Sequence, residues 1–296
     1  MLAFKNYYPI FSLLILLLLP ACGESTTQKE EKDDPAIANL KSSMTLAANF
    51  DQGYDANFAA GDPKVYTGPA YDSLDAPTAG MTSSEIALLE GKGKSGNALQ
   101  FKSKAKPVIF YKSEKNIAYS KENWSGTVSL WLSLNPEEDL APGYTDPIQI
   151  TDQGYDDAAI WVDFSNKNPR SFRMGVYGDV DVWNPDNIGP DENPAFNSRL
   201  LPATDRPFTR ESWTHVAVSF SRLNTQNGRA EFFINGKSQG TRDITEPYTW
   251  ELEKSRIFLG LNFVGLMDEV SIYNKALTAD EIKSLYELPG GLTDLL

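Results

Sequence analysis

The feature of this sequence that most limits its fold is a succession of short runs in which apolar and polar residues alternate, separated by Gly, Pro, Asn and Asp. Such runs are typical of half-buried β-strands, because successive side chains of a strand point to opposite faces. Roughly 245 residues without a second linker or an internal repeat fit one all-β domain. The predicted strands cover residues 45–50, 98–101, 107–111, 126–134, 147–151, 158–164, 171–177, 213–221, 229–235, 256–260 and 268–273.

Two local signals refine this prediction. Asn235 and Gly236 separate two strand-like runs, and this dipeptide favours a two-residue type I′ hairpin turn. One helix is predicted over residues 278–287, where Thr278 and Glu281 have capping-box spacing and apolar residues form a stripe. Many strands with a single late helix indicate an all-β sandwich rather than an α/β fold.

The N-terminal segment has the pattern of an export signal. Lys5 precedes an apolar run over residues 10–19, which is too short for a stable membrane span. The run ends in Leu-Pro-Ala-Cys (residues 19–22), which resembles the lipobox of bacterial lipoproteins. That resemblance implies a signal peptide over residues 1–21, acylation of Cys22, and lipid anchoring in the bacterial cell envelope, on the outer membrane, periplasmic or surface side. The alternative is an ordinary secretory signal with a chance cysteine.

Composition divides the rest of the chain. Residues 22–43 are polar and charged, which predicts a lipidated Cys22 followed by a disordered tether. The domain is predicted over residues 44–288, with a C-terminal tail over residues 289–296. Cys22 is the only cysteine, which excludes disulfides, thiol catalysis and zinc–thiolate sites.

The charge of the chain limits its partners. A net charge of −13 opposes binding to nucleic acid and to anionic membranes. We therefore expect membrane contact through the lipid anchor only. Neutral partners such as glycans, or cations such as calcium, suit the acidic chain better.

Several segments spread over the domain resemble one known family. They are ANFD (48–51), GKSGNALQF (93–101), GTVSLWL (126–132), WTHVAV (213–218), EFFING (231–236), GLMDEVSIYNKAL (265–277) and ADEI (279–282). In this order they are similar to the laminin-G-like (LamG3) form of the concanavalin A-like lectin/glucanase superfamily. The resemblance implies a jelly-roll sandwich of two curved antiparallel sheets, with a concave face that often carries ligand contacts. Members bind sugars, proteins or calcium, or cleave polysaccharides, so the fold leaves the function open.

The sequence lacks the pattern expected of a glycosidase. Glycosidases place two carboxylates across the scissile bond, and the glucanases of this superfamily carry them as Glu-x-Asp-x-x-Glu on one strand. Asp268 and Glu269 are adjacent and point to opposite faces, while Asp163 is alone on its predicted strand. No nucleophile-elbow motif accompanies His215, the only histidine. We therefore predict no catalytic residues and no enzyme activity.

Alternation places large aromatic residues and a charged pair on the outward face of three successive predicted strands. Trp131 is on the first, Trp161 and Asp163 are on the second, and Arg173 and Tyr177 are on the third. If these strands are neighbours in the concave sheet, the side chains form a platform that suits the C–H faces and hydroxyls of sugars. The alternative is that long loops cover the aromatic residues and make a second, smaller core.

Residues 178–210 form a long insertion that is rich in Asp, Asn and Pro and contains Trp183. Loops of this length in a compact domain are usually functional or disordered. Trp183 either overhangs the concave face and contacts the ligand or attaches the loop to the sandwich.

Asp51 and Asp268 are candidate calcium ligands. They match positions at which related folds join the first and last strands through a cation, and calcium prefers oxygen ligands brought together by loops. The alternative, which we favour, is that both aspartates accept backbone hydrogen bonds at strand ends. No cofactor is required by the sequence.

His215 lies on a predicted strand that is apolar on both faces, which indicates a buried structural residue rather than a catalytic one. The favoured function is a non-catalytic, lipid-anchored module that binds carbohydrate on the concave sheet. A structural or adhesion protein that binds protein partners is the alternative, and a glycoside hydrolase is the third reading.

Overall fold

The computed structural model describes residues 1–5, 35–190 and 192–296 of the chain. Most of the predicted signal peptide, Cys22 and the first part of the predicted tether lie outside the described residues. The described residues from 35 onward form one compact unit. None of the helices in the described ranges is long and apolar enough to cross a membrane.

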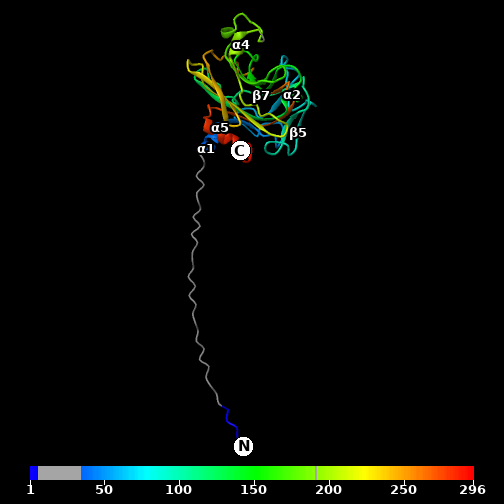
Figure 1. Ribbon diagram of the computed structural model, residues 1–296, viewed down its shortest axis with the longest axis vertical. Coiled ribbons are helices and arrows are strands. Elements are labelled where there is room, and N and C mark those ends of the chain that lie inside the picture. Colours follow the sequence, from blue (N-terminus) through cyan, green and yellow to red (C-terminus); the bar gives the residue numbers. More distant parts are fainter. Residues whose placement is uncertain (6–34, 191) are drawn as a thin grey trace. The chain divides into compact units, whose positions relative to one another are not determined.

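Two sheets stack face to face and enclose the main hydrophobic core (Figure 1). In the nine-stranded sheet the order is β15-β14-β13-β8-β17-β1-β2, and β6 joins β17 and β5 beside this path. In the eight-stranded sheet the order is β12-β11-β10-β9-β16-β7-β3-β4. Neighbouring strands of both sheets pair antiparallel, which confirms the predicted sandwich.

The strands of the nine-stranded sheet are β1 (Met44–Ala48), β2 (Phe58–Ala59), β5 (Ile86–Leu89), β6 (Ala98–Phe101), β8 (Trp124–Ser133), β13 (Thr214–Leu223), β14 (Gly228–Ile234), β15 (Lys237–Ile244) and β17 (Gly265–Tyr273). Those of the eight-stranded sheet are β3 (Val65–Gly68), β4 (Thr78–Ala79), β7 (Val108–Lys112), β9 (Thr145–Thr151), β10 (Ala159–Phe164), β11 (Phe172–Tyr177), β12 (Leu200–Pro202) and β16 (Arg256–Leu261). A short helix, α2 (Pro136–Asp139), follows β8.

Every run predicted as a strand overlaps a strand of the structure. The strands that the pattern missed are short or, like β15, lack apolar alternation because they lie at a sheet edge with mostly polar, accessible side chains. The predicted hairpin is confirmed: β14 and β15 pair from Ile234 to Lys237, and Asn235 and Gly236 have φ angles of 49° and 73°, both positive as a type I′ turn requires.

Helices cover the outer face of the nine-stranded sheet. They are α1 (Pro35–Ser43), α5 (Ala279–Tyr286) and the 3₁₀ helix η1 (Gly291–Asp294). Residues 35–43, predicted as part of a disordered tether, instead form α1, because Ile37 and Leu40 lie one helical turn apart and pack into this layer. The predicted tail over residues 289–296 is likewise packed, through the buried Leu292 and Leu295.

The start of α5 has the capping box that the sequence predicts. The Thr278 hydroxyl accepts a hydrogen bond from the Glu281 N–H at 3.3 Å, and the Glu281 carboxylate accepts one from the Thr278 N–H at 2.9 Å. Because Thr278→Ala removes an N-cap partner, we expect it to lower the free energy of unfolding by about 1 kcal/mol. Urea denaturation measures this, and an unchanged midpoint would contradict a stabilising role for the cap.

The outer face of the eight-stranded sheet is covered differently. The insertion at residues 178–210 forms α3 (Val180–Trp183), α4 (Pro194–Ser198) and the edge strand β12, and it packs over β10 and β11. In Figure 1, α4 lies at the end of the domain opposite α1 and α5. Beside this insertion the same sheet face is hollowed, and there the candidate site lies.

Candidate binding groove

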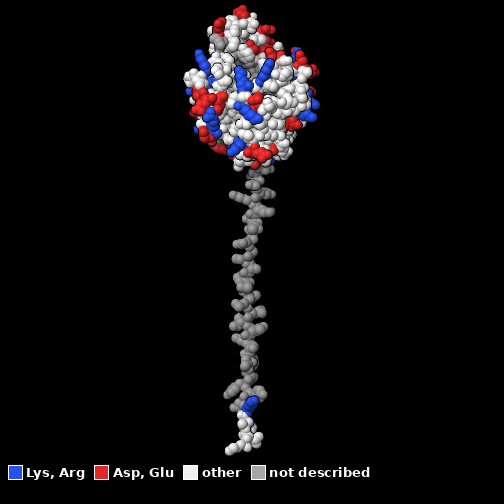
Figure 2. All heavy atoms as spheres, turned by 90° about the vertical axis from the view of Figure 1, so that its right-hand side faces the viewer, with Lys and Arg blue, Asp and Glu red and all other residues white. Residues whose placement is uncertain are grey.

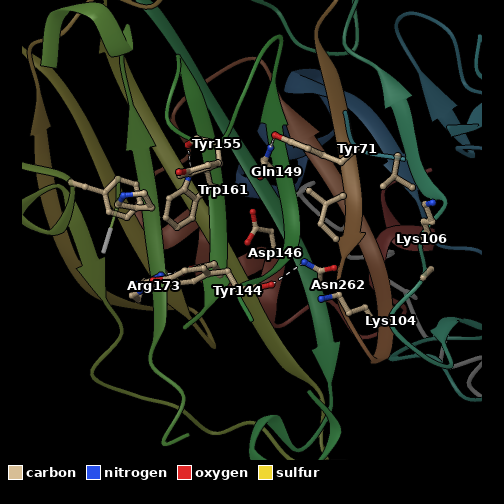
Figure 3. A pocket seen from close by; sticks show the side chains of 16 residues that line it. Tyr71, Lys104, Lys106, Tyr144, Asp146, Gln149, Tyr155, Trp161, Arg173 and Asn262 are labelled. Carbon is tan, nitrogen blue, oxygen red and sulfur yellow. Dashed lines mark hydrogen bonds and ion pairs between the residues drawn. The ribbon is translucent and has the colours of Figure 1, made fainter. Parts of the chain in front are cut away.

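A cavity of about 590 Å³ opens on the outer face of the eight-stranded sheet (Figure 3). Strands β9, β10 and β11 supply polar and aromatic side chains to its floor. Loops far apart in the sequence supply its walls, around Tyr71, Lys104, Tyr155 and Pro190. We call this cavity the groove.

Five side chains from three neighbouring strands carry the chemistry of the floor: Asp146 and Gln149 from β9, Trp161 and Asp163 from β10, and Arg173 from β11. Trp161 pairs with Gln149 and Asp163 pairs with Arg173 across the ladder. Three of these residues, Trp161, Asp163 and Arg173, are ones that alternation placed on the outward face. The structure therefore brings these three predicted ligand-binding residues together.

The charged groups of the floor are already paired in part. Arg173 Nε donates to Asp163 Oδ1 at 2.9 Å, and Arg173 Nη2 donates to Asp163 Oδ2, so that the pair is bidentate. The guanidinium also lies over the ring of Tyr144, with 5.4 Å between its carbon and the ring centroid. Burial raises the pKa of Asp163, while the hydrogen bonds and charge of Arg173 lower it. The Arg173–Asp163 pair thus holds both side chains in one orientation at the base of the groove.

Asp146 is the carboxylate of the floor that no arginine holds. Burial raises its pKa well above the usual range, the charge of Asp163 raises it further, and Arg173 lowers it. Sequence alternation did not find Asp146, because it has the same parity as the core residues Ile148 and Ile150. The register between β9 and β10 shifts next to it, between the pairs Val162–Ile148 and Phe164–Thr145, and such an irregularity redirects side chains.

The walls of the groove combine aromatic rings, amides and two lysines. The Gln149 side-chain amide donates to the Tyr71 hydroxyl, and the Asn262 amide donates to the carbonyl of Tyr144 at 3.1 Å. Figure 3 shows Trp161 and Tyr155 on one side of Asp146, with the lysines Lys104 and Lys106 on the other. Alternation in the predicted strand 147–151 places Gln149 on the outward face. No local sequence pattern predicts that the loop residues Tyr71, Lys104 and Asn262 lie against this sheet.

Tyr177 and Trp183 lie behind the groove rather than in it. With Trp161 and Phe196 they form a separate small core under the insertion. The ring of Tyr177 stacks on Trp161 at a centroid distance of 5.6 Å and on Phe196 at 4.9 Å, and the Trp183 indole N–H donates to the Asp156 carbonyl at 3.0 Å. The covered-aromatic alternative therefore describes Tyr177 and also Trp161, which is only 3% exposed although it lines the groove. Trp183 attaches the insertion to the sandwich.

Trp131 is not part of this surface, so the three-strand platform predicted with Trp161 and Tyr177 does not form. Its strand, β8, lies between β13 and β17 in the nine-stranded sheet. The Trp131 ring stacks on Tyr286 of α5 at 5.5 Å, and the Lys94 ammonium lies over it at 4.8 Å. The physical reason is that alternation assigns a residue to the outer face of a sheet but does not say of which sheet.

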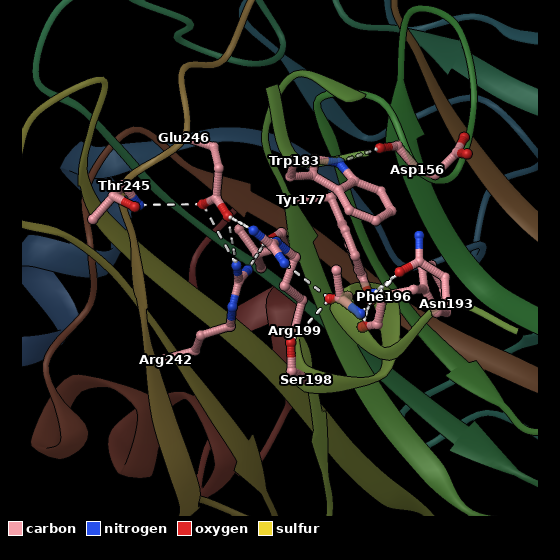
Figure 4. A network of polar contacts seen from close by, with 12 residues as sticks. Asp156, Tyr177, Trp183, Asn193, Phe196, Ser198, Arg199, Arg242, Thr245 and Glu246 are labelled. Atoms are coloured by element: carbon pink, nitrogen blue, oxygen red, sulfur yellow. Dashed lines mark hydrogen bonds and ion pairs between the residues drawn. The ribbon is translucent and has the colours of Figure 1, made fainter. Parts of the chain in front are cut away.

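A buried ion cluster holds the insertion against β15 (Figure 4). Arg199 follows α4 and forms an ion pair with Glu246, with 2.7 Å between Nη2 and Oε1. Arg242 of β15 lies 3.3 Å from the same oxygen and also donates to the Val176 carbonyl of β11. Because the Arg199 guanidinium packs over the Trp183 ring at 5.2 Å, this cluster fixes the insertion that backs the aromatic side of the groove.

Asp51 and Asp268 lie at the other sheet, on either side of the loop 93–97. The Asp268 carboxylate accepts hydrogen bonds from the Lys94 N–H at 2.8 Å and from the Glu269 N–H at 2.7 Å, and Asp51 accepts one from the Asn97 N–H at 2.7 Å. Burial, and then the charge of Glu269, raise the pKa of Asp268 to about 9. Both aspartates thus accept backbone hydrogen bonds, as the favoured alternative predicts. Asp51 lies after β1, but Asp268 lies within β17, beside a register shift, and not at a strand end.

Within the described ranges, no three His, Cys, Asp or Glu side chains are arranged to hold a metal ion. Calcium binding by Asp51 and Asp268 stays a prediction from the sequence.

His215 is completely buried in the nine-stranded sheet. Its Nε2 lies 2.8 Å from the Ser129 hydroxyl, and its ring is 5.0 Å from that of Trp131. Burial, and to a lesser extent the charge of Lys94, lower its pKa to about 3, so the imidazole is neutral at pH 7. A neutral ring sealed from solvent suits the structural role that the strand pattern predicts.

Comparison with known proteins agrees with this architecture. Residues 113–283 match the family model Laminin_G_3, described as the concanavalin A-like lectin/glucanases superfamily. No curated protein matches the chain.

Two similar structures were solved with a bound sugar. Domain 4 of an extracellular arabinanase from Geobacillus stearothermophilus, solved in complex with arabinotriose, is 19% identical, with a TM-score of 0.51 over 83% of this chain and 100% of that one. The ligand-binding domain of botulinum neurotoxin serotype D, solved in complex with N-acetylneuraminic acid, is 11% identical, with a TM-score of 0.51 over 85% of this chain and 52% of that one. This chain thus spans about half the length of the neurotoxin domain, and at these identities the likeness shows the fold alone.

Proposed function

Because the chain belongs to the Laminin_G_3 family of the concanavalin A-like lectin/glucanases superfamily, we propose that its domain is a non-catalytic carbohydrate-binding module that holds a glycan in the groove. One observation carries the proposal: the groove places aromatic rings beside hydrogen-bonding side chains on the one sheet face that helices α1 and α5 leave open. Its volume of about 590 Å³ falls in the range of small-molecule sites.

The groove offers the two kinds of contact that sugars use. The rings of Tyr71 and Tyr155 border it and are partly exposed, and aromatic rings pack against the C–H faces of pyranoses. Trp161 also lines the groove, but it is only 3% exposed and supports the floor. Asp146 and Arg173 are partly exposed and offer an acceptor and donors to hydroxyl groups, while the buried Asp163 holds Arg173 in place. The sugar-bound structures of the arabinanase and neurotoxin domains support such a role, because they carry a ligand of this class on the same fold.

The carboxylates of the groove favour binding over hydrolysis. A glycosidase needs one carboxyl group as an acid and a second as a base or nucleophile. The groove contains Asp146 and Asp163, but both oxygens of Asp163 are engaged by Arg173. That leaves Asp146 alone to reach a glycosidic oxygen or an attacking water. The proposed activity is therefore retention of a glycan without cleavage.

The place of the module in the cell follows from the N-terminal pattern. A signal peptide over residues 1–21 and an acylated Cys22 would fix the domain to a membrane of the bacterial cell envelope. Mass spectrometry of the membrane-extracted protein tests this part. A mature N-terminus at Cys22 that carries acyl chains is expected, and an unmodified Cys22 in the mature chain would contradict it.

The binding proposal is tested by screening the protein on a glycan array and titrating the best ligand. Tyr71→Ala removes a ring that borders the groove and is expected to weaken binding by about tenfold or more. Tyr66→Ala is the matched control, because Tyr66 lies on β3 outside the groove lining and stacks on Phe110. Equal affinity of the two variants would count against the groove, and capture of a protein with no glycan bound would favour the adhesion alternative.

A further inference from the structure

The acidic charge of this chain is unevenly distributed. Between Glu90 and Glu114 there is no Asp or Glu, and the same stretch contains the lysines Lys92, Lys94, Lys102, Lys104, Lys106 and Lys112. In a chain with 40 acidic and 27 basic residues, this stretch is a local reversal of sign. Figure 2 shows one face of the domain on which Lys and Arg side chains gather near the middle. The charge of residues 91–113 is therefore positive, although the net charge of the whole chain is negative.

The lysines of this stretch have different surroundings. Lys94 lies over the Trp131 ring on the other sheet, Lys112 lies 3.9 Å from Asp62, and Lys102 donates to the Ser84 carbonyl at 2.9 Å. Lys104 and Lys106 are exposed and line the groove. In the part of the chain that the structure describes, neither of these two forms an ion pair with a carboxylate.

The other charges of the groove do not cancel these lysines. Arg173 and Asp163 neutralise each other through their bidentate pair. Asp146 lies in the groove floor, and burial raises its pKa well above the usual range, so it is protonated over a wider pH range than an exposed aspartate. Lys104 and Lys106 therefore place two positive charges at their end of the groove. Because screening in physiological salt acts over about 8 Å, these nearby charges act on a bound group more strongly than the distant charges that make up the net charge.

We propose that the groove selects an anionic glycan, one that carries carboxylate or sulfate groups, and that Lys104 and Lys106 bind those groups. This inference rests on the proposed function and specifies its ligand. The sugar would lie across the floor with its ring face toward Tyr155 and its anionic group toward the two lysines. Figure 3 shows Asp146 between these two sides of the groove. Ammonium groups of lysine form charge-assisted contacts with such oxyanions.

The test compares matched acidic and neutral glycans on one array: uronate-bearing, sialylated and sulfated glycans, each beside its uncharged counterpart. Affinities for the best acidic member are then titrated with the wild type and with the double variant Lys104→Gln/Lys106→Gln. We expect the wild type to prefer acidic members, and the double variant to lose at least about tenfold in affinity for them. Binding of the wild type should weaken as NaCl is raised.

The control is Lys92→Gln/Lys237→Gln, which removes the same charge from two exposed lysines outside the groove lining. This pair should bind within about twofold of the wild type. An equal loss in both double variants, or equal affinity for acidic and neutral members, overturns the inference. If neutral glycans bind and Tyr71→Ala weakens that binding, the proposed function stands without the anionic preference, whereas binding to no glycan overturns both.

Discussion

Replacement of Glu246 by glutamine is expected to lower the free energy of unfolding by about 3–5 kcal/mol, the usual cost of breaking a buried ion pair. The carboxylate lies between Arg199 at 2.7 Å and Arg242 at 3.3 Å, and all three side chains are mostly buried. Without it, two guanidinium groups of like charge stay close together in a site that disfavours ions. Urea denaturation monitored by tryptophan fluorescence measures the loss.

The same substitution should also weaken glycan binding. Glu246 holds Arg199, which packs over Trp183, and Trp183 belongs to the small core that backs Trp161 in the groove. The matched control is Glu251→Gln, whose partner Lys254 lies 2.8 Å away in an exposed pair, and exposed pairs contribute little. Comparable unfolding midpoints for the two variants would contradict the role given to the Glu246 cluster.

This contribution has a defined pH dependence. Burial raises the pKa of Glu246, but its backbone hydrogen bond and the charges of Arg242 and Arg199 outweigh burial, so the net pKa lies below the usual value. A carboxyl group whose pKa is lower in the folded than in the unfolded state stabilises the fold above its unfolded pKa, near 4.3, and loses that effect as the pH falls. The difference between wild type and Glu246→Gln should therefore be largest near neutral pH and shrink below about pH 4.

Trp161→Ala should have the second large effect, on stability and on binding together. The indole stacks on Tyr177 and donates from Nε1 to the Tyr155 carbonyl at 2.7 Å. A Cβ on Gly175 would lie 2.3 Å from the ring, so the packing here is close. Removal of a buried tryptophan costs about 3–5 kcal/mol, and this one also lines the groove and supports its floor.

The control for Trp161→Ala is Trp124→Ala, which removes an equally buried ring from the main core and leaves the groove lining unchanged. Both variants should melt earlier than the wild type in calorimetry. Titrations at a temperature at which both are folded should then show lost glycan affinity for Trp161→Ala only. Unchanged affinity of the folded Trp161→Ala protein would remove Trp161 from the site.

The main features of the fold were readable from the sequence. Alternation predicted the strands and their inward faces, so Leu130, Val162 and Met174 lie in the core as expected. The Asn235-Gly236 turn and the Thr278 cap were predicted for the same reason, since both depend on residues only a few positions apart. For the site, three of the predicted outward residues, Trp161, Asp163 and Arg173, line the groove.

What the sequence determined by itself was therefore the local periodicity: which segments are strands, which of their side chains face inward, and where turns and caps lie. Only the tertiary structure decided which outward-facing side chains lie on the same sheet and line the same groove. It placed Trp131 under α5 and not beside Trp161, and it brought Lys104 and Asn262 to the same groove as Asp146. The physical reason is that alternation reflects the dihedral angles of neighbouring residues. Sheet membership, the register shift beside Asp146 and the approach of loops depend on contacts between residues far apart in the chain.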